Sequence, residues 1–193
     1  MPTAITIIKD EHRALAAELR GIQYLIEQYR GGRQAPDFAL LNSMIAYIEA
    51  FPDKLHHPKE DEYVYRVLRE REPAAAATLD ELQDEHRRGP DATGRMTSAL
   101  KEWQHDPAAF DVFVQAATDY AEFQYAHMRK EEQAILPLAE KSLLPSDWIA
   151  IDAAFGSNAD PLVGVDTQRE FRELFRIVVN RMPAPMGLGP ERP

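Results

Sequence analysis

Seven residues of the sequence have the side chains and the spacing of a transition-metal site. They are five histidines and two glutamates: His12, His56, His57, Glu60, His86, His127 and Glu131. Imidazole and carboxylate groups are ligands of non-haem iron and related metals. Glu60 lies four residues after His56, so the two side chains share one face of a helix. Glu131 repeats this spacing after His127. The sequence therefore predicts metal ligands that are presented by helices.

The number of ligands favours two metal ions. Seven ligands are too many for one ion, whereas two ions bridged by two carboxylates use all of them. With a bridging oxo or hydroxo group, these ligands would fill all but one of the positions of two octahedral iron ions. The open position could bind a small molecule such as dioxygen, nitric oxide or peroxide. Zinc or manganese could occupy similar ligands.

Four helices are needed to bring these ligands to one level. If successive helices are antiparallel, each turn should lie midway between their ligands. The point midway between His12 and His56 is residue 34, within the breaker-rich run 31–36. The next two midpoints fall just before Pro73 and Pro107. We therefore predict an all-α fold, an up-down-up-down four-helix bundle with helices at 3–30, 37–71, 74–104 and 107–141 and short additional C-terminal helices.

The apolar pattern of the first helix indicates that its ligand points inward. Ile5, Ile8, Leu15 and Leu19 follow at helical spacing with one gap, and His12 fills that gap. Similar stripes pass through the ligand positions of the third and fourth helices. A single histidine on such a stripe is more often an ordinary core residue. An unpaired carboxylate in a core, however, costs on the order of several kcal/mol, so the two glutamates favour a bound cation.

Prolines interrupt the second and third helices near the ligands. Leu55 and Val64 still place the second-helix ligands near the inner face. Pro58 should bend this helix, either to aim the ligands or simply to fit the bundle. Gly89 and Pro90 predict an interruption of the third helix just after its histidine.

The composition narrows the function classes. The chain has 193 residues, enough for one domain or slightly more, and 45% of them are hydrophobic. Its net charge of −10 argues against nucleic-acid and anionic membrane partners. No run approaches the roughly 18 apolar residues of a membrane span, and no signal peptide is visible. The absence of cysteine excludes disulfides and thiolate metal sites. We expect a cytoplasmic protein.

The pattern changes after residue 141. Residues 146–155 are typical of a short helix with Ser146 as its N-cap. Residues 160–164 are typical of a loop, 168–181 of another helix, and the last residues of an extended tail. We expect residues 1–141 to form the bundle and residues 142–193 to pack on it or in a homodimer.

The order of the ligands resembles that of hemerythrin-like proteins, the HHE cation-binding family. The order is His, His-His-x-x-Glu, His and His-x-x-x-Glu, and the stretches 10–13, 51–61, 84–86 and 127–131 are similar to the family's signatures. The resemblance covers about residues 5–140. It implies a four-helix bundle with a non-haem diiron site, in which His12 and His56 bind one iron. It also implies that His86 and His127 bind the other iron and that the two glutamates bridge them.

One position departs from the oxygen-carrying hemerythrins. They have a second histidine one turn after the third-helix histidine, where this chain has Pro90. His57 would replace that ligand, because some family members use the residue after the second-helix histidine. The altered geometry of the second iron argues against simple reversible oxygen carriage.

Three functions are compatible with this site. The first is binding or sensing of dioxygen, nitric oxide or a related small molecule. The second is a redox enzyme that acts on peroxide or nitric oxide, and the third is iron storage or iron sensing. Histidine-rich ligation favours binding, because bundle diiron enzymes of oxygenation use more carboxylates.

Four further residues lie near the predicted ligands or near the ends of the helices. Tyr63 and Tyr120 could donate hydrogen bonds to a bound small molecule, although core packing explains them as well. Gln124, one turn before His127, could contact a ligand or only its neighbours. His105 should lie on the surface, next to the turn after the third helix.

Overall fold

The computed structural model describes residues 2–157, which are mostly helical. The α-helices are α1 (Thr3–Arg30), α2 (Phe38–Ala50), α3 (His57–Lys59), α4 (Arg66–Arg71), α5 (Ala76–His105), α6 (Phe110–Lys130), α7 (Leu136–Ser142) and α8 (Pro145–Gly156). Wide π-helical turns are η1 (Pro52–His56), η2 (Glu60–Tyr65) and η5 (Glu131–Ile135), and short 3₁₀ turns are η3 (Pro73–Ala75) and η4 (Pro107–Ala109). No strand occurs in residues 2–157, so the predicted all-α class is confirmed there.

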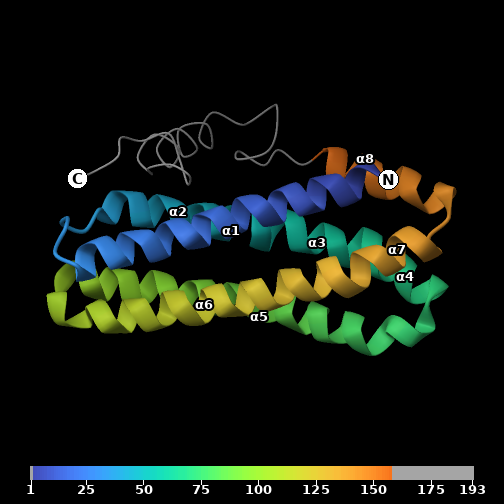
Figure 1. Cartoon of the computed structure of the whole chain (residues 1–193). Coiled ribbons are helices and arrows are strands. Elements are labelled where there is room, and N and C mark those ends of the chain that lie inside the picture. The colour runs from blue at the N-terminus through green and yellow to red at the C-terminus, as the bar shows by residue number, and fades with distance from the viewer. Residues whose placement is uncertain (1, 158–193) are drawn as a thin grey trace.

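The helices pack side by side into an elongated bundle (Figure 1). α5 lies along α6, α2 contacts both α1 and α5, and α1 contacts α6. The segments α2 to α4 follow one another as one rod, as do α6 and α7. In Figure 1 the chain turns back after α1, after α4 and after α5. The predicted helix ranges agree with these rods to within three residues at each end.

Local sequence explains the turns between the rods. After α1, Gly32 has a φ of 65°, a left-handed conformation that glycine adopts without steric cost. Asp37 begins α2, and its side chain accepts a hydrogen bond from the backbone N–H of Leu40 at 3.1 Å. Asp106 accepts from the N–H of Ala108 at 2.9 Å at the start of the last rod. Each turn is therefore fixed by a residue type suited to it.

The wide turns change which residues face inward. In η1 the N–H of His56 donates to the carbonyl of Phe51, five residues earlier, at 3.2 Å. Such a turn holds one more residue than an α-helical turn, so the following side chains are rotated. Leu55 was predicted to face the core, and that prediction is wrong because its side chain is 38% exposed.

The third rod does not break at Gly89 and Pro90. α5 continues through both residues, so the predicted interruption is wrong. Pro90 faces solvent, and a proline there removes one backbone hydrogen bond. Gly89 is buried, and a Cβ atom in its place would lie 3.2 Å from Oδ1 of Asp53. Gly89 thus leaves room for the Asp53 side chain against the helix.

Apolar side chains form two core clusters along the bundle. The Trp103 cluster includes Leu19, Ile22, Leu100, Trp103 and Phe113. The Phe155 cluster includes Ile5, Ile8, Leu79, Leu82 and Phe155. In α1 and α5 the predicted ligands lie between the residues of the two clusters. A polar layer therefore separates two apolar layers.

α8 fixes the beginning of the bundle. The N-terminus of α1 has no side-chain cap from its own segment, since Pro2 occupies that position. Instead, the N–H of Ala4 donates to Oδ1 of Asp152 in α8 at 2.8 Å. Nζ of Lys59 also donates to the carbonyl of Ala154 at 2.9 Å. α8 thus joins the first rod to the second.

The predicted helix after residue 141 is present, with a different start. Ser146 was expected as the N-cap, but α8 already begins at Pro145, which suits a first helical position because it needs no N–H partner. The side chain of Asp147 accepts from the N–H of Leu144 at 2.9 Å. The predicted loop 160–164, helix 168–181 and tail lie outside the described residues. The division into domains at residue 141 stays a prediction.

No helix within residues 2–157 has both the length and the apolar character that a bilayer span requires.

Candidate metal centre

The seven predicted side chains converge in the polar layer. All of them are buried, and His86 is the most exposed at 8%. Ligand atoms of six of them, all but Glu131, form two groups in which every atom lies within 4.8 Å of the others. One group is His12, His56 and Glu60, and the other is His57, Glu60, His86 and His127. The structure therefore brings the predicted residues together, and their role as metal ligands stays a prediction.

Glu60 lies between the two histidine groups. Its Oε1 is 3.3 Å from Nε2 of His56, and its Oε2 is 3.5 Å from Nε2 of His86. Both oxygens are buried without a hydrogen-bond partner. Each carboxylate oxygen thus faces a different histidine group, which is the arrangement that a bridging ligand needs.

Glu131 occupies the equivalent place on the last rod. Its Oε2 is 3.2 Å from Nε2 of His12 and 3.4 Å from Nε2 of His127, and it has no hydrogen-bond partner. Unpaired carboxylate oxygens in a core are costly, so such a cluster suits a bound cation. Nitrogen and oxygen donors without thiolates suit iron, manganese or zinc. The residues fit the metal pair that the sequence predicts.

Four of the histidines also contact carboxylates through their other ring nitrogen. The Nδ1-to-oxygen distances are 3.0 Å for His12 to Glu132, 2.6 Å for His56 to Glu11, 3.0 Å for His86 to Asp61 and 2.9 Å for His127 to Glu85. An Nδ1–H that donates to a carboxylate leaves Nε2 as the free lone pair. Metal-binding histidines commonly have such partners. The sequence analysis did not identify these four acids.

His57 has a different environment from the other four. Its ring stacks on that of His86, with centroids 4.4 Å apart and planes at 15°. Nδ1 of His57 is 3.7 Å from Oδ1 of Asp53, and neither atom has a hydrogen-bond partner. Burial and the neighbouring histidines hold the pKa of His57 well below its usual range, so the ring is neutral, as a metal ligand must be.

The pKa values of the other predicted ligands show how protons balance the negative charge of the glutamates in this layer. Burial alone would lower the pKa of His12, but the neighbouring carboxylates of Glu131 and Glu132 raise it to about 9. Burial also opposes ionisation of Glu131, yet His127 and His12 hold its pKa well below the usual range. Without a metal, protonated imidazoles therefore supply the positive charge that the glutamates require.

Tyr65 is a site residue that the sequence analysis missed. Its hydroxyl donates a hydrogen bond to Oε1 of Glu131, and its ring stacks on His86 with centroids 5.5 Å apart. Burial and the Glu131 charge raise its pKa well above the usual value, so the phenol stays protonated. Tyr63, the other candidate donor, is half-buried and packs against the Phe155 cluster, so core packing explains it. The wide turn η2 accounts for the inward position of Tyr65, because it turns the fifth residue after Glu60 inward.

Tyr120 and Gln124 belong to a separate buried polar group. The amide of Gln124 donates to the hydroxyl of Tyr120 at 3.0 Å. Thr93 donates to Oδ2 of Asp53 at 3.2 Å on the same side of the layer. Burial raises the pKa of Asp53 to about 6. His105, as predicted, is exposed at the end of α5.

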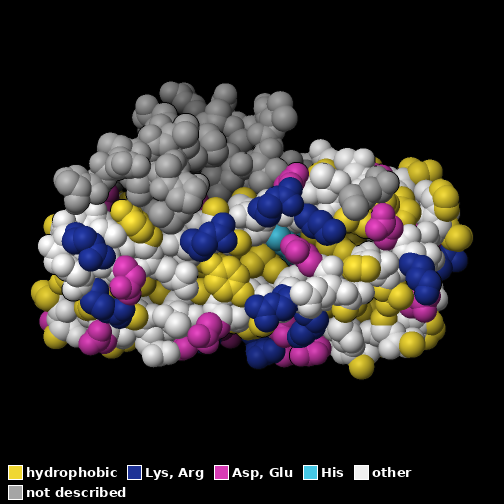
Figure 2. Space-filling model, in the orientation of Figure 1, with side chains coloured by type: hydrophobic (Ala, Val, Ile, Leu, Met, Phe, Trp, Pro, Cys, Tyr) yellow, Lys and Arg dark blue, Asp and Glu magenta, His cyan; other side chains and the backbone are white. Residues whose placement is uncertain are grey.

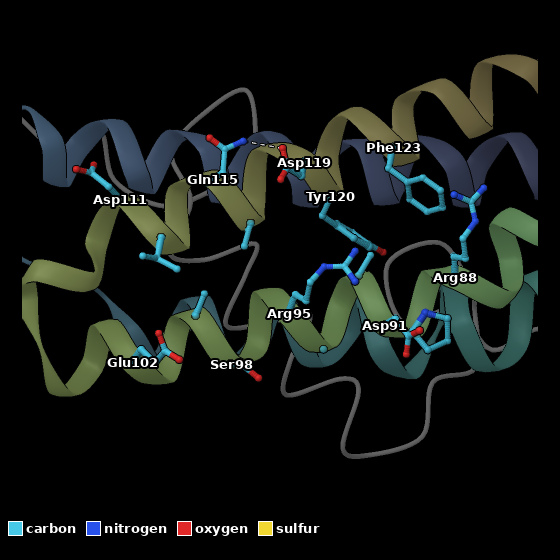
Figure 3. Close-up of a pocket in the computed structure, with 16 residues that line it drawn as sticks. Arg88, Asp91, Arg95, Ser98, Glu102, Asp111, Gln115, Asp119, Tyr120 and Phe123 are labelled. Atoms are coloured by element: carbon cyan, nitrogen blue, oxygen red, sulfur yellow. Dashed lines mark hydrogen bonds between the residues drawn. The ribbon is translucent and has the colours of Figure 1, made fainter.

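Two cavities differ in their relation to the layer. A small cavity of about 10 Å³ adjoins it and is lined by Glu11, His12, Leu15, Phe51, Pro52, His56, His57 and Met128. A much larger open groove of about 1260 Å³ lies between α5 and α6, with Arg88, Arg95, Asp119 and Tyr120 along it (Figure 3). None of the seven predicted ligands lines the groove. On the face shown in Figure 2, one histidine reaches the surface near the middle of the bundle, among charged side chains.

Comparisons with known proteins identify the family. No curated protein and no solved structure matches the chain. The model of the hemerythrin HHE cation-binding domain matches residues 3–139, which hold all seven predicted ligands. The chain therefore belongs to the hemerythrin HHE cation-binding domain family, whose members bind metal in a helical domain.

Proposed function

We propose that this protein is a non-haem diiron protein that binds or senses dioxygen, nitric oxide or a related small molecule. Its cofactor is two iron ions with a bridging oxo or hydroxo group. One observation carries the proposal: both oxygens of Glu60 and Oε2 of Glu131 are buried without hydrogen-bond partners and lie between two groups of imidazoles. The geometry supports a metal pair better than a single ion, because each glutamate faces both groups.

The distances support a division of the ligands between the two irons. His12 and His56 would hold one ion, since their Nε2 atoms are 3.3 Å apart. His86 and His127 would hold the other, with Nε2 atoms 3.1 Å apart. His57 belongs to this second group and takes the place of the ligand that Pro90 cannot supply. Bound iron would supply reversible electron transfer and an open coordination position.

The small cavity supports a ligand of very few atoms. Its volume of about 10 Å³ is close to that of one water-sized probe. Leu15, Phe51 and Met128 make its walls apolar, beside His12 and His56. Apolar walls favour a neutral diatomic molecule over an ion. The phenol of Tyr65 lies on the other histidine group, where it holds Glu131 in place.

We propose the scaffold, the location and the partners of the protein on the same basis. The scaffold is an up-down-up-down four-helix bundle, supported by the reversals of the chain in Figure 1. The protein acts in the cytoplasm on a small diatomic ligand or peroxide, with no nucleic-acid or membrane partner, and could form a homodimer.

Iron titration followed by small-molecule kinetics tests this function. Anaerobic addition of Fe(II) should saturate at two ions per chain, with Mössbauer spectra of a coupled pair after oxidation. One ion per chain at saturation would overturn the diiron assignment. Stopped-flow mixing of the reduced protein with dioxygen, nitric oxide or peroxide then separates the functions. A reversible spectral change supports binding, whereas sustained peroxide turnover without bleaching supports the redox enzyme.

A cavity variant tests the entry of the small molecule. Leu15→Phe should fill the small cavity and slow the reaction with nitric oxide about tenfold, while two irons still bind. The control is Leu25→Phe, a similar substitution on the same helix within the Trp103 cluster. Equal rates in the two variants would show that the ligand does not enter through this cavity.

A further inference from the structure

Four carboxylates that are not among the predicted ligands link the helices in a closed ring. We propose that Glu11, Asp61, Glu85 and Glu132 are positioning residues, each of which orients the histidine of the next rod. This inference rests on the proposed metal pair and adds the residues that prepare its ligands. Each acid is adjacent in sequence to a predicted ligand on its own rod, yet it contacts a histidine on a different rod.

The links follow one another around the bundle and return to their start. Glu11 of the first rod contacts His56 of the second, and Asp61 of the second contacts His86 of the third. Glu85 of the third rod contacts His127 of the fourth. The fourth rod closes the ring, because its Glu132 contacts the histidine of α1. Every rod thus contributes one acid to the histidine of the next rod, and its own histidine contacts an acid of the preceding rod.

Helix geometry explains why the ring has a single rotational sense. Neighbouring positions on a helix are about 100° apart, so a residue beside an inward ligand points toward the adjacent rod. On the first and third rods the acid precedes the histidine, as Glu11 precedes His12. On the second and fourth rods the acid follows the glutamate, as Asp61 follows Glu60. Because these rods run in the opposite direction, both orders turn the acid the same way around the bundle.

The ring determines which nitrogen each histidine presents to the centre. A carboxylate that accepts a hydrogen bond from Nδ1–H fixes both the tautomer and the ring plane. The Nε2 atoms then point inward, where those of His12 and His56 lie 3.3 Å apart. The imidazoles are therefore oriented for metal binding before a metal arrives, which reduces the reorganisation that binding requires.

The four links differ in burial, which predicts an order of effects. The Glu11 side chain is 3% exposed and that of Glu85 is 12% exposed. Those of Asp61 and Glu132 are 32% and 40% exposed. Water can replace a partner at the exposed links but not at the buried ones. Lys130 contacts Glu85 at 2.7 Å and keeps that acid ionised.

Metal affinity and histidine tautomers together test the ring. Glu11→Ala should weaken one of the two Fe(II)-binding steps about 10- to 100-fold in a chelator competition, and Glu85→Ala should weaken the other. Glu11→Gln and Glu85→Gln keep the size of the side chain and an acceptor oxygen, so they should lose less iron affinity than the alanine variants. They keep the test valid if an alanine variant fails to fold. The matched controls are Asp10→Ala and Asp84→Ala, since these neighbouring acids pair with arginines of their own helix. The controls should bind iron as the wild type does.

A tautomer measurement on the metal-free protein provides the second readout. The ¹⁵N–¹H spectrum should show the signature of a hydrogen-bonded Nδ1 proton on His56 that is lost in Glu11→Ala, and one on His127 that is lost in Glu85→Ala. Unchanged Nδ1 signals, or iron affinities equal to those of the controls, would overturn the ring. A wild-type chain that binds fewer than two irons would overturn the proposed function instead, and the tautomer measurement would still decide the ring.

Discussion

The apolar clusters and the polar layer between them are held by different forces. In the Trp103 cluster, Trp103 packs edge-on against Tyr29 and Phe38, with ring centroids 5.0 and 4.8 Å apart. Removing such surfaces from water stabilises the fold without any partner. The polar layer instead buries Glu60 and Glu131 with unpaired oxygens, which opposes folding unless a cation is present. The clusters therefore build the scaffold, and the layer makes its stability depend on what it binds.

Metal loading should give the largest difference between the two regions. Each ion at a thousandfold excess over its Kd adds about 4 kcal/mol to the free energy of unfolding. Two ions should raise the Tm by about 15–30 °C in a chain of this size. Calorimetry with Fe(II) under anaerobic conditions and with a chelator measures this shift. A Tm that is equal in both conditions would show that the layer does not bind iron.

A cavity in the Trp103 cluster should affect the scaffold and leave the layer intact. Phe113 is fully buried there, and Phe113→Ala should lower the free energy of unfolding by about 3–5 kcal/mol. The loss should be the same with and without metal, and iron stoichiometry should stay at two. Chemical denaturation and iron analysis check both points. A loss of bound iron at moderate temperature would show that the two regions are coupled.

The pH dependence of stability should have opposite signs in the metal-free and metal-loaded protein. The folded pKa of His12 is about 9 against an ordinary value of 6.5, so its contribution is complete below pH 6.5. It is lost as the pH rises through 9, a change of about 3 kcal/mol in the free energy of unfolding of the metal-free protein. The loaded protein should not lose stability over this window, because metal binding requires deprotonated imidazole.

Denaturation curves at pH 6.5, 7.5 and 9, with and without metal, measure this difference. His12→Gln should flatten the slope of the metal-free protein, which makes it the control. A metal-free protein that becomes more stable between pH 6.5 and 9 would contradict the assignment of protons to this layer.

The smallest effect is expected at Tyr65. Tyr65→Phe removes the donor to Glu131 and should lower the metal-free free energy of unfolding by about 2 kcal/mol. Tyr63→Phe changes the same atoms two residues earlier, at a half-buried position, and should change it by less than about 0.5 kcal/mol. Urea denaturation compares the two. Equal effects of the two substitutions would show that the Tyr65 hydroxyl does not stabilise the polar layer.

Much of the fold could be predicted because it depends on local patterns. The breakers at 31–36, Pro73 and Pro107 mark the reversals of the chain, and the rods begin and end within three residues of the predicted ranges. The convergence of the seven side chains follows from these ranges, since equal distances from a turn bring residues of antiparallel rods to one level. Periodicity and breakers therefore predicted the helix ranges correctly wherever the helices are regular.

The errors occur where the helices depart from regular geometry. Leu55 was assigned to the interior on an α-helical period, and Tyr65 was missed, because η1 and η2 each insert an extra residue into a turn. α5 also continues through Pro90, which is exposed, and Gly89 leaves room for Asp53, a residue that is distant in sequence. The four acids of the ring were visible only as neighbours of the ligands.

The hydrogen bond from Ala4 to Asp152 has a consequence for the order of events during synthesis. The beginning of α1 receives its cap from a residue that is 148 positions later in the chain. A ribosome adding about 5–20 residues per second needs several seconds or more to reach it. During that time the growing chain already contains His12 and His56, while the partners of His12 on the last rod have yet to emerge. The buried His/Glu cluster can therefore be completed only after the last rod has been made, when nearly the whole bundle is available to enclose it.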